Sequence, residues 1–237
     1  MGIIAEIKQE LDKHRDPEKA AFFPRFFQAG PGGYAEGDQF IGVTVPVQRR
    51  IAKQFYREIS LEELQVLLGD PIHECRLTAL LMLVNKYQRT KTETERKVLV
   101  EFYLANTVFI NNWDLVDTSA DKILGAYLFE KERDLLFELA QSGDLWQQRI
   151  AIIATFYFIR QGDFQDTLHL AKLLLHHEHH LIHKAVGWML REVGNRDFQV
   201  EYDFLKEHYQ EMPRTMLRYA IEKFNPVLRQ DFLKGRI

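Results

Sequence analysis

The chain has 237 residues, 46% of them hydrophobic and 27% charged, so it can bury a sizeable core and is not a disordered or fibrous protein. Its single cysteine, Cys75, excludes an intramolecular disulfide and a thiolate metal cluster, and it indicates a reducing, cytoplasmic compartment. The formal net charge of -3 does not indicate nucleic-acid binding, so a DNA-binding surface would have to be a local basic stripe.

The N-terminal residues carry no signal-peptide pattern, and no lipidation motif begins the chain. The longest apolar run, residues 150–159, is about half as long as a membrane crossing requires. We therefore expect no membrane association.

Apolar residues recur at helical spacing from one end of the chain to the other, and the alternation typical of strands is nearly absent. This pattern predicts an all-helical protein, and we expect one domain over residues 1–237. Breakers separate helices of about ten to eighteen residues. In chain order they read "RDPEK", "QAGPGGYAEGDQFIG", "LGDP", "QSGD", "RQGD", "EVGNRD", "EMPR" and "FNP".

The glycine-rich segment, residues 28–42, holds five of the thirteen glycines. It lacks the G-K-[ST] of a phosphate-binding loop and follows no strand, so we interpret it as an ordered loop between two helices. The next helix begins near Pro46 and is expected to expose Arg49 and Arg50.

A repeat emerges when the second helix of each predicted pair is aligned. The aligned positions fall at steps of 37, 36, 35 and 34 residues, which are periods of helix-pair solenoids, and they are Arg76, Trp113, Arg149, Lys184 and Arg218. Such helices line one concave wall, so four cations and a tryptophan would recur along it and match regularly spaced phosphates. The alternative is that the stems of these cations cover apolar surface.

The segment "NNWDLVDTSA" places Trp113 and Asp117 four residues apart, on one face of a helix. A carboxylate among aromatic rings can stabilise the oxocarbenium-like charge of glycosidic cleavage. The alternative is a structural or surface aspartate. Trp188 follows Lys184 by four residues, so an indole and a cation share a face there as well, and Trp146 in "GDLWQQR" completes the three tryptophans.

The run "LLLHHEHHLIHK" pairs His176 with His180 and His179 with His183 at helical spacing. It lacks the H-E-x-x-H zinc motif and a nearby cysteine, so we interpret it as a polar turn between helices. No other motif indicates a metal or an organic cofactor, and we expect the protein to need none.

Four segments, "NNWDLVD", "LWQQRIAIIATFYFIRQG", "LIHKAVGWMLREVGNRD" and "MPRTMLRYAIEKF", resemble the AlkD-like DNA alkylation repair family in order, and the likeness runs from about residue 20 to 230. The resemblance implies a right-handed superhelix of antiparallel HEAT-like helix pairs whose basic concave face holds duplex DNA. It also implies a monofunctional glycosylase that excises cationic N3- and N7-alkyl purines. By the resemblance, the catalytic carboxylate is Asp117, the lesion-facing tryptophans are Trp113 and Trp188, and a phosphate ligand is Arg149.

We therefore expect a monomeric DNA glycosylase in which further cations hold phosphates: Lys184, Arg191, Arg76 and Arg218. Two other functions fit the same scaffold. One is a non-catalytic module that binds branched or damaged DNA, and the other is a helical-repeat protein whose concave face binds another protein.

Overall fold

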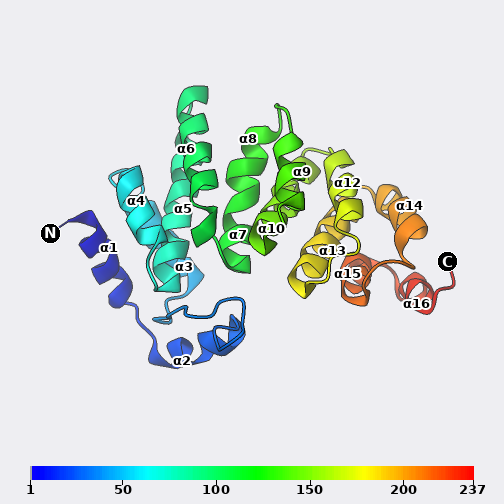
Figure 1. Cartoon of the computed structure of the whole chain (residues 1–237), viewed down its shortest axis with the longest axis horizontal. Coiled ribbons are helices and arrows are strands. Elements are labelled where there is room, and N and C mark those ends of the chain that lie inside the picture. Colours follow the sequence, from blue (N-terminus) through cyan, green and yellow to red (C-terminus); the bar gives the residue numbers. More distant parts are fainter. Residues whose placement is uncertain (1) are drawn as a thin grey trace. The chain divides into compact units, whose positions relative to one another are not determined.

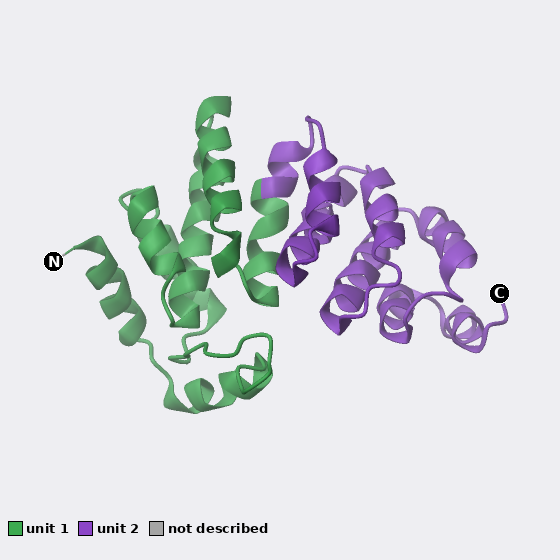
Figure 2. Ribbon diagram, in the orientation of Figure 1, with its two compact units in different colours: residues 1–123 green, residues 124–237 purple. Residues whose placement is uncertain are grey.

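The computed structural model describes residues 2–237, in which helices are the only extended regular elements, beside one isolated bridge between Gln39 and Ile72 (Figure 1). The all-helical prediction is confirmed. The chain divides into two compact units, the first ending at Ile123 and the second beginning at Leu124 (Figure 2). A single domain and a superhelix through the whole chain stay predictions.

The first unit is built around one long helix, α5, on which α3, α4, α6 and α7 all pack. Most side chains of α5 are buried, so it forms the centre of the unit's core. The helices of this unit are α1 (Ile3–Asp12), α2 (Pro17–Phe26), α3 (Val45–Phe55), α4 (Leu61–Leu68), α5 (His73–Arg89), α6 (Glu93–Ala105), a 3-10 turn (Thr107–Phe109) and α7 (Trp113–Ala120).

Local sequence signals set where these helices begin. Ser60 and Glu63 form a capping box at the start of α4, and the Thr92 side chain caps α6. Pro46 lies in the first turn of α3, as predicted, and Arg49 and Arg50 are exposed beyond it.

The glycine-rich segment is an ordered loop between α2 and α3, and it is fixed by a buried carboxylate of α5. Glu74 is 1% exposed and accepts hydrogen bonds from the backbone amides of Ile41 (3.1 Å), Gly42 (2.8 Å) and Val43 (3.3 Å). Gly42 has a φ of +82°, and a Cβ there would lie 2.1 Å from the carbonyl oxygen of Asp16. Only glycine fits this position.

The second unit is also built around one long helix, α13, which packs against α10, α14 and α15. Gly187 allows the close approach of α15, since a Cβ on it would lie 2.4 Å from the carbonyl oxygen of Met216. The helices of this unit are α8 (Ala126–Leu128), α9 (Asp134–Gln141), α10 (Leu145–Ala154), α11 (Phe156–Arg160), α12 (Gln165–Leu173), α13 (His180–Gly194), α14 (Phe198–His208), α15 (Arg214–Ala220), a 3-10 turn (Ile221–Lys223) and α16 (Pro226–Lys234). A π-helical turn, Asp121–Gly125, precedes α8.

Candidate active site

Helix α7 begins at Trp113, and Trp113 and Asp117 line the same pocket, a cavity of ≈ 440 Å³ in the first unit. The Asn112 side chain caps the helix by accepting a hydrogen bond of 2.8 Å from the Trp113 amide. Both the indole and the carboxylate are half-buried. The expectation that i and i+4 spacing places them on one face is confirmed.

Phenylalanines from α2 and its C-terminal end build an aromatic wall around Trp113. The Phe27 ring stacks on the indole with centroids 5.5 Å apart and 22° between the planes, and the Phe26 ring meets it edge-on at 5.8 Å. Phe26 is 51% exposed and also stacks against Phe22, which is 57% exposed. None of the residues of α2 is buried, so this helix presents its aromatic rings to the pocket and to solvent.

A buried charged network lies behind this wall and joins the loop, α5 and α7. His73 contacts Asp38 through Nδ1 at 3.1 Å and Asp114 through Nε2 at 2.8 Å. Arg76 donates to Asp38 at 2.6 Å and to the carbonyl oxygen of Asp70 at 3.2 Å. The network therefore fixes the N-terminal turn of α7, which carries Trp113, to the loop that follows the aromatic wall.

The charge state of His73 follows from its two carboxylate neighbours. Burial alone lowers the pKa of the imidazole, but the charge of Asp114 and the hydrogen bonds to Asp114 and Asp38 outweigh it and raise the pKa of His73 to about 9. Burial would raise the pKa of the Asp38 carboxyl, but hydrogen bonds from His73 and Arg76 hold it below its usual range. At neutral pH the network contains an imidazolium that donates to both carboxylates.

Glu74 and Asp114 also line the pocket, so Asp117 is one of three carboxylates there. One expectation about this unit is wrong. Arg76 does not lie open on a phosphate-binding wall, because it is 5% exposed and its guanidinium is committed to Asp38. A buried arginine that neutralises a buried aspartate is not available to a phosphate without breaking that pair.

In the second unit, α13 carries three of the predicted site residues. Trp188 is half-buried, stacks at a tilt against Phe156 with centroids 5.7 Å apart, and donates from Nε1 to Glu192 at 3.2 Å. Lys184 is half-buried one turn earlier. Arg191 pairs with Glu222 of the 3-10 turn and lies 3.7 Å from Glu192, so its charge is balanced by carboxylates.

The remaining predicted cations differ in exposure. Arg149 of α10 is 4% exposed and donates to the carbonyl oxygen of Leu181 at 2.6 Å, which joins α10 to the start of α13. Arg218 of α15 is exposed. The predicted stripe therefore has an open cation at Arg218, a partly open one at Lys184, and buried guanidinium groups at Arg149 and Arg76.

The histidine run forms the predicted polar turn between α12 and α13. His179 caps α13 by accepting from the Leu181 amide at 3.2 Å, and His177 lies 2.9 Å from the side-chain oxygen of Gln148. Within residues 2–237, no group of three or more His, Cys, Asp or Glu side chains has the geometry to hold a metal ion.

Sequence reasoning missed Phe26, Phe27, His73 and Asp114. The signal for the aromatic pair is present in "AAFFPRFFQAG", where two Phe-Phe doublets stand four residues apart at helical spacing. No local pattern reveals the contact of His73 with Asp38 and Asp114, which lie 35 and 41 residues away along the chain.

A comparison with known protein families shows which family the chain belongs to. The family model described as "DNA alkylation repair enzyme" matches residues 7–224. The chain belongs to this family. As a DNA alkylation repair enzyme, it has a role in the repair of alkylated DNA and has DNA as its partner.

The fold agrees with this assignment. One similar solved structure is that of a "Predicted DNA alkylation repair enzyme from Enterococcus faecalis"; the match covers 90% of this chain and 98% of that chain, with a TM-score of 0.66 and 18% identity. No curated protein matches the sequence. None of the described helices of this family member combines the length and apolar character needed to span a bilayer.

Proposed function

We propose that the protein is a monofunctional DNA glycosylase that hydrolyses the N-glycosidic bond of cationic N3- and N7-alkyl purines in duplex DNA. One observation carries the proposal: Trp113 and Asp117 line a single aromatic pocket on the first turns of α7. Family membership supplies the context of alkylation repair. The protein acts as a cytoplasmic monomer and without a cofactor in this proposal.

The chemistry of the leaving group explains why one carboxylate suffices. An N3- or N7-alkylated purine already carries a positive charge, so it departs without protonation by a general acid. The barrier then lies in the oxocarbenium-like charge that develops at C1′ of the deoxyribose. Asp117 stabilises this charge and orients the attacking water, because a fixed carboxylate in a water-poor pocket interacts strongly with a developing cation.

The aromatic rings act on the same positive charge. The indole face of Trp113 is electron-rich and attracts a cationic base or sugar. Phe27 stacks behind this ring and the network of His73 and Asp114 fixes the helix that carries it, so the indole is held in place before substrate binds. Trp188, in the second unit, is assigned a contact with DNA by the family resemblance.

The cations of the second unit hold the DNA backbone. Lys184 and Arg218 have open surface and are assigned to phosphate groups. Arg149 is 4% exposed and donates to the carbonyl oxygen of Leu181, so the phosphate role that the resemblance implies for it is not part of this proposal. Arg191 lies on α13, the helix that carries Lys184, and adds positive charge there. Its pairing with Glu222 reduces that charge.

The test is the release of free methylated purine from methylated duplex DNA, measured by mass spectrometry. Wild type and Asp12→Asn, which makes the same chemical change at a solvent-exposed position, should release base alike. Asp117→Asn should release base about 10² to 10³ times more slowly, because a single pre-placed electrostatic contact to the transition state has that magnitude. Its affinity for the intact methylated duplex should be unchanged.

Two results would contradict the proposal in different ways. Full activity of Asp117→Asn would remove the carboxylate from the mechanism. Tight, salt-sensitive DNA binding by the wild type with no base release would favour the non-catalytic module that binds branched or damaged DNA.

A further inference from the structure

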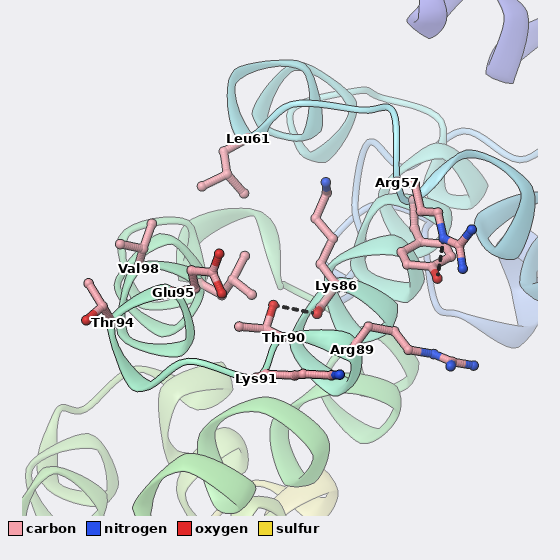
Figure 3. Close-up of a pocket in the computed structure, with 11 residues that line it drawn as sticks. Arg57, Leu61, Lys86, Arg89, Thr90, Lys91, Thr94, Glu95 and Val98 are labelled. Carbon is pink, nitrogen blue, oxygen red and sulfur yellow. Dashed lines mark hydrogen bonds between the residues drawn. The ribbon is translucent and has the colours of Figure 1, made fainter.

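A second pocket lies at the opposite end of α5 from His73. It is a cavity of ≈ 620 Å³ between the C-terminal end of α5, the first turns of α6 and the start of α4 (Figure 3). Helix α5 has 17 residues and therefore runs for about 25 Å, so the two pockets are separate sites. The proposed lesion chemistry uses none of the residues that line this second cavity.

One side of the cavity is cationic. Arg57, Lys86, Arg89 and Lys91 all line it. Arg57 is held in place because its Nε donates to the Tyr56 hydroxyl at 3.0 Å. Among residues 2–237, no acidic side chain lies within ion-pair distance of Lys86, Arg89 or Lys91. Burial lowers the pKa of the Lys86 amine, so a bound anion would offset the cost of keeping that amine charged.

The other side of the cavity is apolar with hydroxyl groups at its edge. Leu61 and Val98 point into it (Figure 3). Leu99, which is 7% exposed, lines it as well. Thr94 lies at this edge together with Glu95, whose carboxylate accepts a hydrogen bond of 2.7 Å from the Thr92 hydroxyl. The one carboxylate of the cavity therefore lies on α6, across from the cations of α5.

We propose that this pocket binds a nucleotide, with the base against Leu61, Val98 and Leu99 and the phosphate groups at Lys86, Arg89 and Lys91. The volume is in the usual range for a small-molecule site, and the split into an apolar and a cationic side fits a ligand with the same split. Arginine and lysine bind phosphate by charge-assisted hydrogen bonds. Glu95 is positioned to accept a hydrogen bond from an amino or hydroxyl group of the base or ribose.

The ligand chemistry is shared by two sources, a free nucleotide and an unpaired nucleotide of a DNA strand. The inference goes beyond the proposed glycosylase and does not depend on it, because the two pockets share no lining residue.

The experiment is titration calorimetry at low salt with three probes: ATP, inorganic triphosphate and a short unmodified single-stranded oligonucleotide. The test variant is Arg89→Ala/Lys91→Ala, which changes two exposed side chains. The control is Arg15→Ala/Lys97→Ala, which removes two cations of the same unit that are 55% and 64% exposed and lie outside the pocket. A third variant, Val98→Asp, puts a carboxylate on the apolar side, where Val98 is 46% exposed.

We expect the wild type to bind ATP or the oligonucleotide, and the test variant to lose about tenfold or more in affinity. The control should stay within about twofold of the wild type and Val98→Asp should weaken binding as well. Binding of ATP that the oligonucleotide does not displace identifies the free nucleotide as the ligand. Binding of the oligonucleotide alone, weakened in the test variant, identifies a DNA strand.

Three results would overturn the proposal. They are absence of binding by both nucleotide probes, equal affinity of test variant and control, and equal affinity of the wild type for ATP and inorganic triphosphate, which would remove the base from the apolar side. Base release from a short methylated duplex should be the same for the test variant and the wild type. Failure of the nucleotide site and failure of the glycosylase therefore give different results.

Discussion

Both ends of helix α5 carry ionisable side chains. Those at the N-terminal end are buried and paired, whereas those at the C-terminal end line an open cavity. At the N-terminal end His73, Glu74 and Arg76 are buried, and each contacts a group of the glycine-rich loop. At the C-terminal end Lys86 and Arg89 face an open cavity without an acidic partner among the described residues. Buried charged groups are paired and stabilise the fold, whereas cations that stay accessible to solvent remain available to a ligand.

The same substitution at the two ends of α5 should therefore have very different effects on stability. Arg76→Met should lower the free energy of unfolding by about 3 to 5 kcal/mol, because it leaves the Asp38 carboxylate, whose side chain is 8% exposed, with one cationic partner fewer. Arg89→Met should change it by about 0.5 kcal/mol or less, because Arg89 is exposed. Urea unfolding followed by circular dichroism measures both, and equal effects would contradict the distinction.

A pH series tests the network at the N-terminal end alone. The folded-state pKa of His73, about 9, lies above the unfolded value of 6.5, so its contribution is complete below pH 6.5 and is lost as the pH rises towards 9. The difference in unfolding free energy between wild type and His73→Gln should therefore shrink over this interval, by an amount on the order of 3 kcal/mol.

The comparison with His73→Gln is needed because a second group also makes the wild type lose stability as the pH rises. Burial raises the pKa of the Glu201 carboxyl in the second unit to about 9, so the wild type alone also loses stability from that residue as the pH rises. Glu201 is unchanged in both proteins and cancels in the difference. A difference that stays constant from pH 6.5 to 9 would show that His73 is not an imidazolium in the folded state.

A smaller effect is expected at the aromatic wall. Phe26→Ala removes a half-exposed ring from the pocket of Trp113, and kcat/KM for base release should fall about tenfold, since one aromatic stacking contact with a nucleotide contributes about 1 to 3 kcal/mol. Phe198→Ala removes a ring of similar exposure, 47%, from α14 and should leave base release unchanged. Equal rates for the two variants would place the lesion away from Phe26.

Much of the candidate site could be predicted because it is local in the sequence. The pairing of Trp113 with Asp117 needs only the rise and twist of a helix, and the start of α7 at Trp113 follows from a capping asparagine directly before it. The network of His73, Asp38 and Asp114 could not be predicted, since it depends on contacts between segments 35 and 41 residues apart.

The all-helical class, the family and the helix ends at the breakers follow from local sequence, because hydrophobic period, caps and breakers act within a few residues. Which cations are available depends instead on tertiary contacts. The predicted repeat aligns Arg76 with Arg218, yet Arg76 is buried against Asp38 and Arg218 is exposed. The period of a repeat fixes the direction of a side chain along the helix, while burial depends on what distant segments place over it.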